Sequence, residues 1–187
     1  RTRGSIIDAG VPEERVSVVI GDLTEEEVRI KIVESTVARW GHLDVLVNNA
    51  GASITYGKPG FEASDDAYME TMNINLRSVI QLVRLARPHL IRSKGEIVNV
   101  SSIAALNFGI THDPYYAISK AGLDQLTRGL AVDLIGYGVR VNGVSPGIVE
   151  TSFMVNNGLT KEQSEKVCAA FFRERYLLAK RLTQSGP

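Results

Sequence analysis

A tyrosine and a lysine stand four residues apart at the start of a predicted helix. Tyr116 and Lys120 therefore share one helix face. A phenol has an ordinary pKa of about 10, and an ammonium group close by favours the phenolate and lowers that pKa. Such a pair suits a general acid–base catalyst. Tyr176 and Lys180 have the same spacing, but no strand precedes them, so spacing alone does not identify a site.

The pattern around this pair alternates between short β-branched runs and longer segments with helical spacing. We expect strands at residues 16–20, 45–47, 96–100 and 139–144, and helices at residues 4–9, 25–39, 65–92 and 115–135. The strands are near-continuously apolar, which is typical of parallel strands buried on both faces. The alternation predicts right-handed crossovers with helices on both faces. The fold class is therefore α/β, a doubly wound parallel sheet of the Rossmann type, in one domain over residues 1–187.

Composition excludes several classes of protein. The 21 basic and 21 acidic side chains balance, so no overall field draws the chain to nucleic acid. Cys168 is the only cysteine, so an internal disulfide is excluded. We interpret Cys168 as a small apolar packing residue rather than a reactive thiol. No apolar run approaches the roughly 20 residues of a membrane helix. The sequence favours a soluble, cytoplasmic protein.

Small, polar or turn-forming residues follow each predicted strand, at residues 21–24, 48–51, 101–102 and 145–147. In doubly wound sheets, ligands bind beyond the carboxyl ends of the strands. Each segment alone is better explained as ordinary turn chemistry. Four of them at successive strand ends predict a rim where a flat ligand approaches the backbone.

The segments "LVNNAG", "IVNVSS", "YYAISKAGLDQLTRGLAVDL" and "RVNGVSPGIVET" resemble the short-chain dehydrogenase/reductase family in order and spacing, from Gly21 to about Thr151. The resemblance implies an NAD(P)-dependent oxidoreductase that interconverts a carbonyl and an alcohol by hydride transfer. NADP is taken as the working preference, although no residue here distinguishes NADP from NAD.

The resemblance also implies the catalytic roles. Tyr116 is the proton donor or acceptor, and Lys120 lowers its pKa and hydrogen-bonds the nicotinamide ribose. Ser102 holds the substrate oxygen, with Ser101 as the weaker claimant to that role. Asn75 holds a water in the proton relay; the alternative is an amide on the helix surface.

The cofactor contacts implied by the family fall at the strand ends. Asp22 and its neighbour Leu23 match the adenine contact, and Thr151 lies where the carboxamide of the nicotinamide binds. Thr151 also suits the N-cap of the next helix. The remaining implied contacts, besides Tyr116 and Lys120, are Asn49, Ala50, Gly51, Pro146, Gly147 and Ile148.

One departure from the family is the absence of its glycine-rich phosphate-binding turn. The family's first strands and its last strand also have no counterpart, so we expect the Rossmann domain to be incomplete at both ends and residues 1–187 to be part of a longer chain. The alternative function is a catalytically silent member that acts as a scaffold or interaction module.

The partner expected from the sequence is a small carbonyl or alcohol substrate. Four large apolar side chains in the region of the family's substrate lid favour an apolar substrate, although plain core packing explains them equally well: Phe153, Met154, Phe171 and Phe172. The helices at residues 65–92 and 115–135 suggest a homodimer or homotetramer. His42, His89 and His112 do not cluster at ligand spacing, so no metal site is expected; His112, in the loop before Tyr116, is read as solvated or facing substrate.

Overall fold

The computed structural model describes residues 2–54, 60–106, 113–149 and 151–169. Its strands are β1 at Val45–Asn48, β2 at Glu96–Val100 and β3 at Arg140–Val144. Its α-helices are α1 at Thr2–Asp8, α2 at Glu26–Trp40, α3 at Asp65–Met72, α4 at Ser78–Ser93, α5 at Pro114–Leu134 and α6 at Phe153–Asn156. Residues 161–169 are also helical. A π-helical turn, Asn73–Arg77, joins α3 to α4, and short 3₁₀ turns lie at Glu13–Arg15, Gly60–Glu62, Ile103–Ala105 and Ile135–Tyr137.

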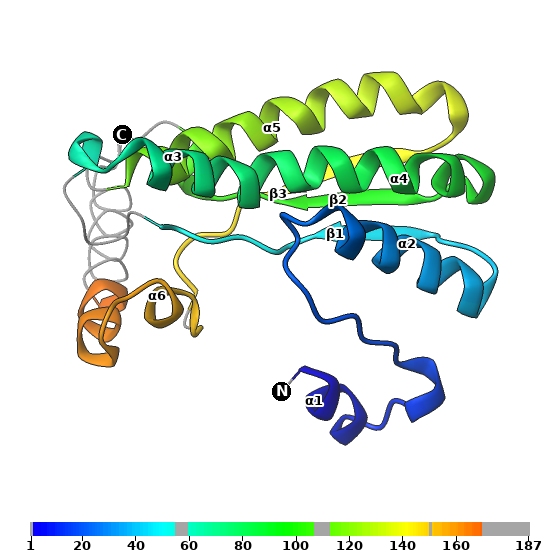
Figure 1. Ribbon diagram of the computed structural model, residues 1–187, viewed down its shortest axis with the longest axis horizontal. Coiled ribbons are helices and arrows are strands. Elements are labelled where there is room, and N and C mark those ends of the chain that lie inside the picture. The colour runs from blue at the N-terminus through cyan, green and yellow to red at the C-terminus, as the bar shows by residue number, and fades with distance from the viewer. Residues whose placement is uncertain (1, 55–59, 107–112, 150, 170–187) are drawn as a thin grey trace, which may run out of the picture.

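The three strands form a parallel sheet in the order β1-β2-β3, in which Leu46 is in register with Ile97 and Ile97 with Val141. Each parallel connection runs through a helix, as parallel pairing requires. Figure 1 shows α4 and α5 lying side by side over the sheet, and α2 packs against α4. The α/β Rossmann-type fold with a parallel sheet is confirmed.

The core lies between the sheet and these three helices. Ala86, Leu90 and Ile97 are completely buried, and Leu123 on α5 is 1% exposed. These side chains belong to one apolar cluster, whose other buried members are Val33, Leu46, Val79, Leu82, Val83, Leu134, Val139 and Val141. The periodic apolar positions of α4 and α5 therefore pack on one face of the sheet, as their spacing predicts.

Two expectations about the strands are wrong for the described residues. Residues 16–20 form no strand, and Val18 and Ile20 are 53% and 90% exposed. No strand of the sheet pairs with this segment, so a β-branched sequence has no ladder to join. In β1, Leu46 and Asn48 are buried while Val45 and Val47 are more than half exposed. Helices thus cover one face of the sheet in the described ranges, not both.

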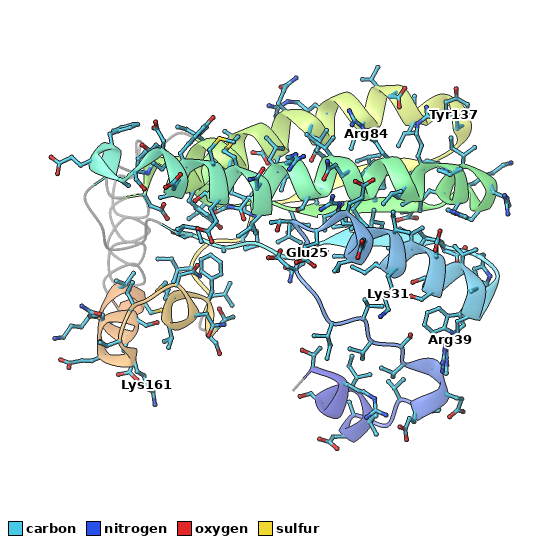
Figure 2. The ribbon with its side chains drawn as sticks, in the orientation of Figure 1. Glu25, Lys31, Arg39, Arg84, Tyr137 and Lys161 are labelled. Atoms are coloured by element: carbon cyan, nitrogen blue, oxygen red, sulfur yellow. The ribbon has the colours of Figure 1, made fainter. Side chains whose placement is uncertain are left out.

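The predicted helices are confirmed with small changes at their ends. Gly10, with φ of 91°, ends the first helix region, and Gly41, with φ of 79°, ends α2; both adopt the left-handed conformation that glycine permits. Near the end of α2, Arg39 donates a hydrogen bond of 2.5 Å to the carbonyl oxygen of Glu14 (Figure 2). This contact ties the N-terminal segment to α2.

Gly95 lies where α4 turns into the sheet. Its amide donates to the carbonyl oxygen of Leu90 at 2.9 Å, and its own carbonyl accepts from Arg140 at 3.1 Å. A Cβ at Gly95 would stand 2.3 Å from the carbonyl oxygen of Asp44, which accepts the amide of Glu96 at 2.7 Å. The backbone around Gly95, near the starts of the three strands, therefore leaves no room for a side chain at this position.

We expect Gly95→Ala to lower the free energy of unfolding by about 2 kcal/mol, because the added methyl group forces the strands apart. Urea denaturation followed by circular dichroism measures this change. Gly4→Ala is the matched control, since nothing lies within 4 Å of a Cβ there, and its stability should not fall. Equal stability of Gly95→Ala and the parent chain would contradict the packing described.

Candidate active site

The carboxyl ends of the strands gather the residues that follow them. Asn48 is in register with Asn99, and Val100 with Val144, so β1, β2 and β3 end at one edge of the sheet. The amide of Ser101 donates to the carbonyl oxygen of Val144 at 2.7 Å and continues the pairing past β2. This edge is the rim that the sequence predicts.

A row of buried polar side chains connects the sheet to α5. Nδ2 of Asn48 donates to Oδ1 of Asn99 at 2.8 Å, and Nδ2 of Asn99 donates to the hydroxyl of Thr127 at 2.9 Å. The Thr127 hydroxyl donates in turn to the carbonyl oxygen of Leu123. Buried amides need such partners, and satisfying them sets the position of α5 along the strands.

Tyr116 and Lys120 lie in the first turns of α5, above this edge. Nζ of Lys120 donates to the carbonyl oxygen of Val100 at 2.8 Å and lies 5.7 Å from the centre of the Tyr116 ring. Lys120 is 4% exposed. Burial lowers the pKa of Lys120 to about 8, partly opposed by the charge of Asp124. The predicted pair is therefore brought together.

The pKa of Tyr116 moves in the direction opposite to our expectation. Burial of the phenol raises its pKa, and the charge of Asp113 raises it further, while a hydrogen bond with Ser102 lowers it. The ammonium of Lys120 is turned toward the Val100 carbonyl at the face of the ring. Desolvation is the largest effect on this pKa, and the phenol keeps its proton at neutral pH.

The two serines after β2 have different environments. Ser102 hydrogen-bonds the Tyr116 phenol, and its hydroxyl also accepts from the amide of Ala104 at 3.1 Å. Ser101 is 5% exposed and donates to the carbonyl oxygen of Lys120 at 3.2 Å. Ser102 thus lies at the reactive phenol, whereas Ser101 fastens α5 to the sheet.

Asn75 is buried in the π-helical turn, with 1% of its surface exposed. Its Oδ1 accepts from the amide of Ala52 at 2.9 Å, and its Nδ2 donates to the Ala52 carbonyl at 2.8 Å and to the hydroxyl of Ser119 at 3.0 Å. Asn75 is therefore not a surface amide. It joins the loop after β1 to α5, close to Lys120.

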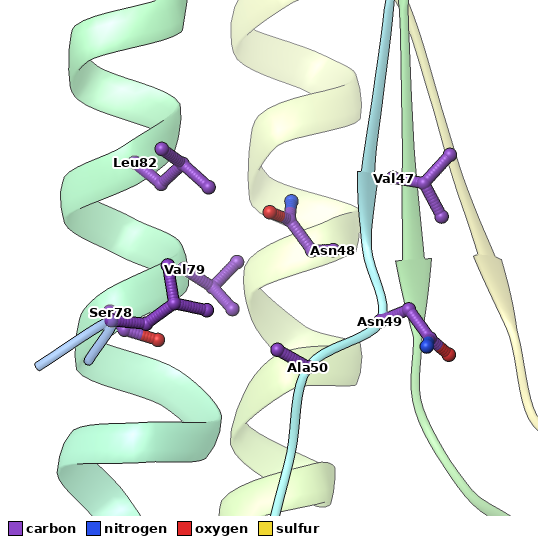
Figure 3. A pocket seen from close by; sticks show the side chains of 8 residues that line it. Val47, Asn48, Asn49, Ala50, Ser78, Val79 and Leu82 are labelled. Atoms are coloured by element: carbon purple, nitrogen blue, oxygen red, sulfur yellow. The ribbon is translucent and has the colours of Figure 1, made fainter. Parts of the chain in front are cut away.

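The predicted cofactor contacts near the front of the site line a hollow between β1 and α4. Leu23, Asn49 and Ala50 are among its lining residues, with Val47, Asn48, Ser78, Val79 and Leu82. Figure 3 shows Asn48 and Ala50 on the side of β1 that faces α4, and Val47 and Asn49 on the other side. Because successive side chains point to opposite sides, the backbone of this segment is accessible to a flat ligand at the rim.

Asp22 and Gly51 are sequence neighbours of Leu23 and Ala50, two residues that line this hollow. Oδ1 of Asp22 accepts from the Thr24 amide at 2.7 Å, and this hydrogen bond is the largest cause of a lowered pKa of Asp22. A Cβ at Gly51 would stand 3.1 Å from Oδ1 of Asn75 and 3.3 Å from Nζ of Lys120. Glycine therefore allows the loop to lie against the two polar side chains.

The predicted contacts after β3 follow the strand along the same edge. The carbonyl oxygen of Pro146 accepts from the amide of Ile103 at 3.0 Å, which holds residues 146–148 beside the turn that carries Ser102. The hydroxyl of Thr151 accepts from the amide of Phe153 at 3.3 Å, so it supports the start of α6. Gly147 and Ile148 belong to no helix or strand.

The start of α6 lies close to Tyr116. The rings of Phe153 and Tyr116 are 5.9 Å apart, while Met154 is 8% exposed. One of the four expected lid residues thus faces the site and one packs inside. Phe171, Phe172, His112, Tyr176 and Lys180 lie outside the described residues.

Sequence reasoning missed a buried pair beside the tyrosine. Oδ2 of Asp113 accepts from the hydroxyl of Ser53 at 2.5 Å, and the two residues are 3% and 1% exposed. An aspartate before Pro114 reads as a helix cap, and no local signal connects it with a serine 60 positions earlier. The only available hint is that both follow segments of the predicted rim.

The described ranges contain neither a candidate metal site nor a candidate membrane-spanning helix. No group of three or more His, Cys, Asp or Glu side chains could hold a metal ion there. No helix in the same part of the chain is long and apolar enough to cross a membrane.

The sequence matches known proteins over most of its length. The family model described as "Enoyl-(Acyl carrier protein) reductase" matches residues 5–184. L-fucose dehydrogenase of Rattus norvegicus is 39% identical over 131 residues, which are 70% of this chain and 48% of that protein. The chain spans about half the length of the curated relatives it matches most strongly.

Solved structures match as well. A short-chain dehydrogenase/reductase of unknown function from Caenorhabditis elegans, crystallised with cofactor, is 46% identical with a TM-score of 0.85, covering 89% of this chain and 62% of that one. ElxO with NADP bound is 32% identical with a TM-score of 0.73, covering 83% of this chain and 62% of that one. Matched structures with NAD are also found.

The lowered pKa of Lys120 makes the stability of the chain depend on pH. The pKa is about 8 in the folded chain and 10.5 for an ordinary lysine. Between these values the unfolded state binds more protons, so the free energy of unfolding rises with pH. We expect this rise to be smaller in Lys120→Met. Urea denaturation at several pH values across the window measures it.

Lys31→Met is the matched control, because Lys31 is exposed on α2 (Figure 2). Its pH profile should follow that of the parent chain. Parallel profiles for the parent chain and Lys120→Met would show that Lys120 has an ordinary pKa, contrary to the burial described.

Proposed function

Because the chain belongs to the short-chain dehydrogenase/reductase family, we propose that it interconverts a carbonyl and an alcohol using NAD(P)(H), with Tyr116 as proton donor or acceptor. The observation that carries this proposal is the cluster formed by Tyr116, Ser102, Lys120 and Asn75. Four residues from three segments, which are α5, the turn after β2 and the π-helical turn, meet near the carboxyl edge of the sheet, where a parallel α/β fold binds its ligands.

Tyr116 performs the proton step. Its raised pKa keeps the phenol protonated, so it can donate a proton to a carbonyl oxygen during reduction. When substrate is present, Ser102 turns its single O–H from the phenol to the substrate oxygen, donates a hydrogen bond to it and stabilises the charge that develops there. Lys120 supplies a positive charge on the far side of the ring at pH values below its pKa of about 8.

Asn75 supports this cluster and the proton relay behind it. Its two amide hydrogens are used by the Ala52 carbonyl and the Ser119 hydroxyl, and one lone pair of Oδ1 is used by the Ala52 amide. The second lone pair of Oδ1 can accept from a water. Such a water would carry protons between Lys120 and solvent.

The residues present fit an adenine nucleotide along the rim. Gly51 lets the loop after β1 lie against Asn75 and Lys120, and the same loop presents backbone beside a hollow that includes Leu23 and Ala50. We assign the adenosine side to Asp22, Leu23 and residues 49–51, and the nicotinamide side to residues 146–148 and Thr151. When bound, the nicotinamide supplies or accepts the hydride. Relatives with either NADP or NAD are found, so both nucleotides are candidates.

The substrate is proposed to be a small carbonyl or alcohol compound that meets an apolar surface beside the phenol. Phe153 supports this proposal, because its ring lies 5.9 Å from that of Tyr116. Assays should therefore include a cyclic ketone and a 2-keto acid, with the cyclic ketone expected to be the better substrate.

We expect Tyr116→Phe to reduce the rate of carbonyl reduction at least about 100-fold, because the proton donor is lost while the ring remains. Nucleotide absorbance under steady-state conditions measures the rate, and thermal melting checks the fold. Tyr176→Phe, at the same spacing from a lysine, should react within a few fold of the parent chain. Equal losses in both variants would refute the assignment, and a parent chain without activity would favour the silent scaffold.

The outer face of α5 supports the proposed homodimer or homotetramer. Ile118 and Val132 are 44% and 79% exposed and stand on one face, two heptads apart. Val83 and Leu123, which lie on the two helices expected to form this contact, are buried in the chain's own core. These two exposed apolar side chains are the part of α5 that we propose meets a second copy of the same helix.

We expect light scattering to give the mass of a dimer or tetramer at micromolar concentration. Val132→Glu should shift the mass toward the monomer, because it places a charge within the contact. Val11→Glu, exposed near the N-terminal segment, is the control and should leave the mass unchanged. A monomeric parent chain would contradict the proposal.

A further inference from the structure

Asp113 precedes the first residue of α5 but does not cap it. Aspartate is a favoured N-cap residue, because its carboxylate can accept from the free amides of the first turn. The side chain of Asp113 makes no capping hydrogen bond, and its backbone has φ of −147° and ψ of 58°. Instead, Oδ2 accepts from the Ser53 hydroxyl at 2.5 Å. The carboxylate thus faces the loop after β1, away from its own helix.

Ser53 connects Asp113 with the other segments around the phenol. Its amide donates to Oδ1 of Asn157 at 2.7 Å, and Asn157 donates from Nδ2 to the carbonyl oxygen of Phe153 at 2.6 Å. The preceding residue, Ala52, is held on both sides by Asn75. Two adjacent residues therefore join the loop after β1 to the π-helical turn, to α5 and to the segment that presents Phe153.

The carboxylate of Asp113 is a charge close to the reactive phenol. It is 3% exposed, so water screens it poorly. Burial raises the pKa of Tyr116 most, Ser102 lowers it, and the charge of Asp113 adds a smaller rise. Among the described residues, the ionisable groups that face the phenol are Asp113 and Lys120; the neutral neighbours are Ser102 from the turn after β2 and Phe153 from α6.

Building on the proposed function, we propose that Asp113 is a positioning residue of this site. Held by Ser53, its carboxylate fixes the start of α5 against the loop after β1 and places a negative charge beside the Tyr116 phenol. The phenol keeps its proton until substrate accepts it, and the same hydrogen-bond chain through Asn157 holds Phe153 at the ring.

Asp113→Asn tests the charge with little change in shape. The readout is the ultraviolet absorbance of tyrosinate as a function of pH, from which the same titration of a matched chain carrying Tyr116→Phe is subtracted. The difference reports Tyr116 alone and needs no turnover. We expect the midpoint for Tyr116 to move to lower pH in Asp113→Asn, because the repelling charge is gone. Asp66→Asn, an exposed aspartate at the start of α3, should leave the midpoint unchanged.

Ser53→Ala tests the anchor and keeps the experiment decisive if Asp113→Asn does not fold. Loss of the hydroxyl removes one of the contacts that hold the carboxylate in place, so the Tyr116 midpoint should again move to lower pH. In a double-mutant cycle, Ser53→Ala should add little to the shift of Asp113→Asn. Additive shifts, or an unchanged midpoint in either single variant, would overturn the assignment and leave a purely structural hydrogen bond.

The outcome is separable from that of the proposed function. A shifted midpoint in a chain that transfers no hydride would refute the proposed function and leave the assignment of Asp113 intact. An unshifted midpoint in an active chain would do the reverse. In an active chain, the alkaline limb of the rate profile should move in the same direction as the spectroscopic midpoint.

Discussion

The two hydrogen bonds between the side chain of Asn75 and the backbone of Ala52 hold the candidate site together. The loop after β1 has no ladder of its own, and this amide satisfies both the N–H and the C=O of one of its residues. The third hydrogen bond, to Ser119, reaches α5. A π-helical turn at Asn73–Arg77 presents the side chain, in keeping with the frequent occurrence of such turns at functional sites. Gly51 can then lie against Lys120.

The pattern of apolar residues predicted most of the fold. β2 has the predicted bounds, and the other strands of the sheet differ from prediction by one residue at an end, because β-branched runs between turn residues leave little choice. The segment at residues 16–20 has the same composition and is not a strand, since a strand exists only where a neighbour accepts its hydrogen bonds. Local sequence cannot supply that neighbour. Local sequence also cannot tell which face of β1 the helices cover. Val45 and Val47 lie on the uncovered face and are therefore exposed.

The site was predictable where its residues are close in sequence or follow a strand. Tyr116 and Lys120 share a helix face by spacing, and Ser102 follows β2 directly. The burial of Asn75 could not be read from its apolar neighbours alone, because it depends on the π-helical turn. The Ser53–Asp113 pair depends on the distance between two loops, which no periodicity encodes.

Burial affects the pKa values of Tyr116 and Lys120, the proposed catalytic pair, more than their pairing does. It lowers the pKa of Lys120 and raises that of Tyr116, so both side chains are shifted toward their neutral forms. Lys120 turns its ammonium to the Val100 carbonyl, while Ser102 and Asp113 act on the phenol in opposite directions. The outcome at neutral pH is a protonated phenol beside a cationic lysine, an arrangement suited to donating a proton. Removing a proton from an alcohol requires the phenolate form of Tyr116, which the buried carboxylate of Asp113 disfavours. Ser102 and Asp113 therefore set the balance between carbonyl reduction and alcohol oxidation.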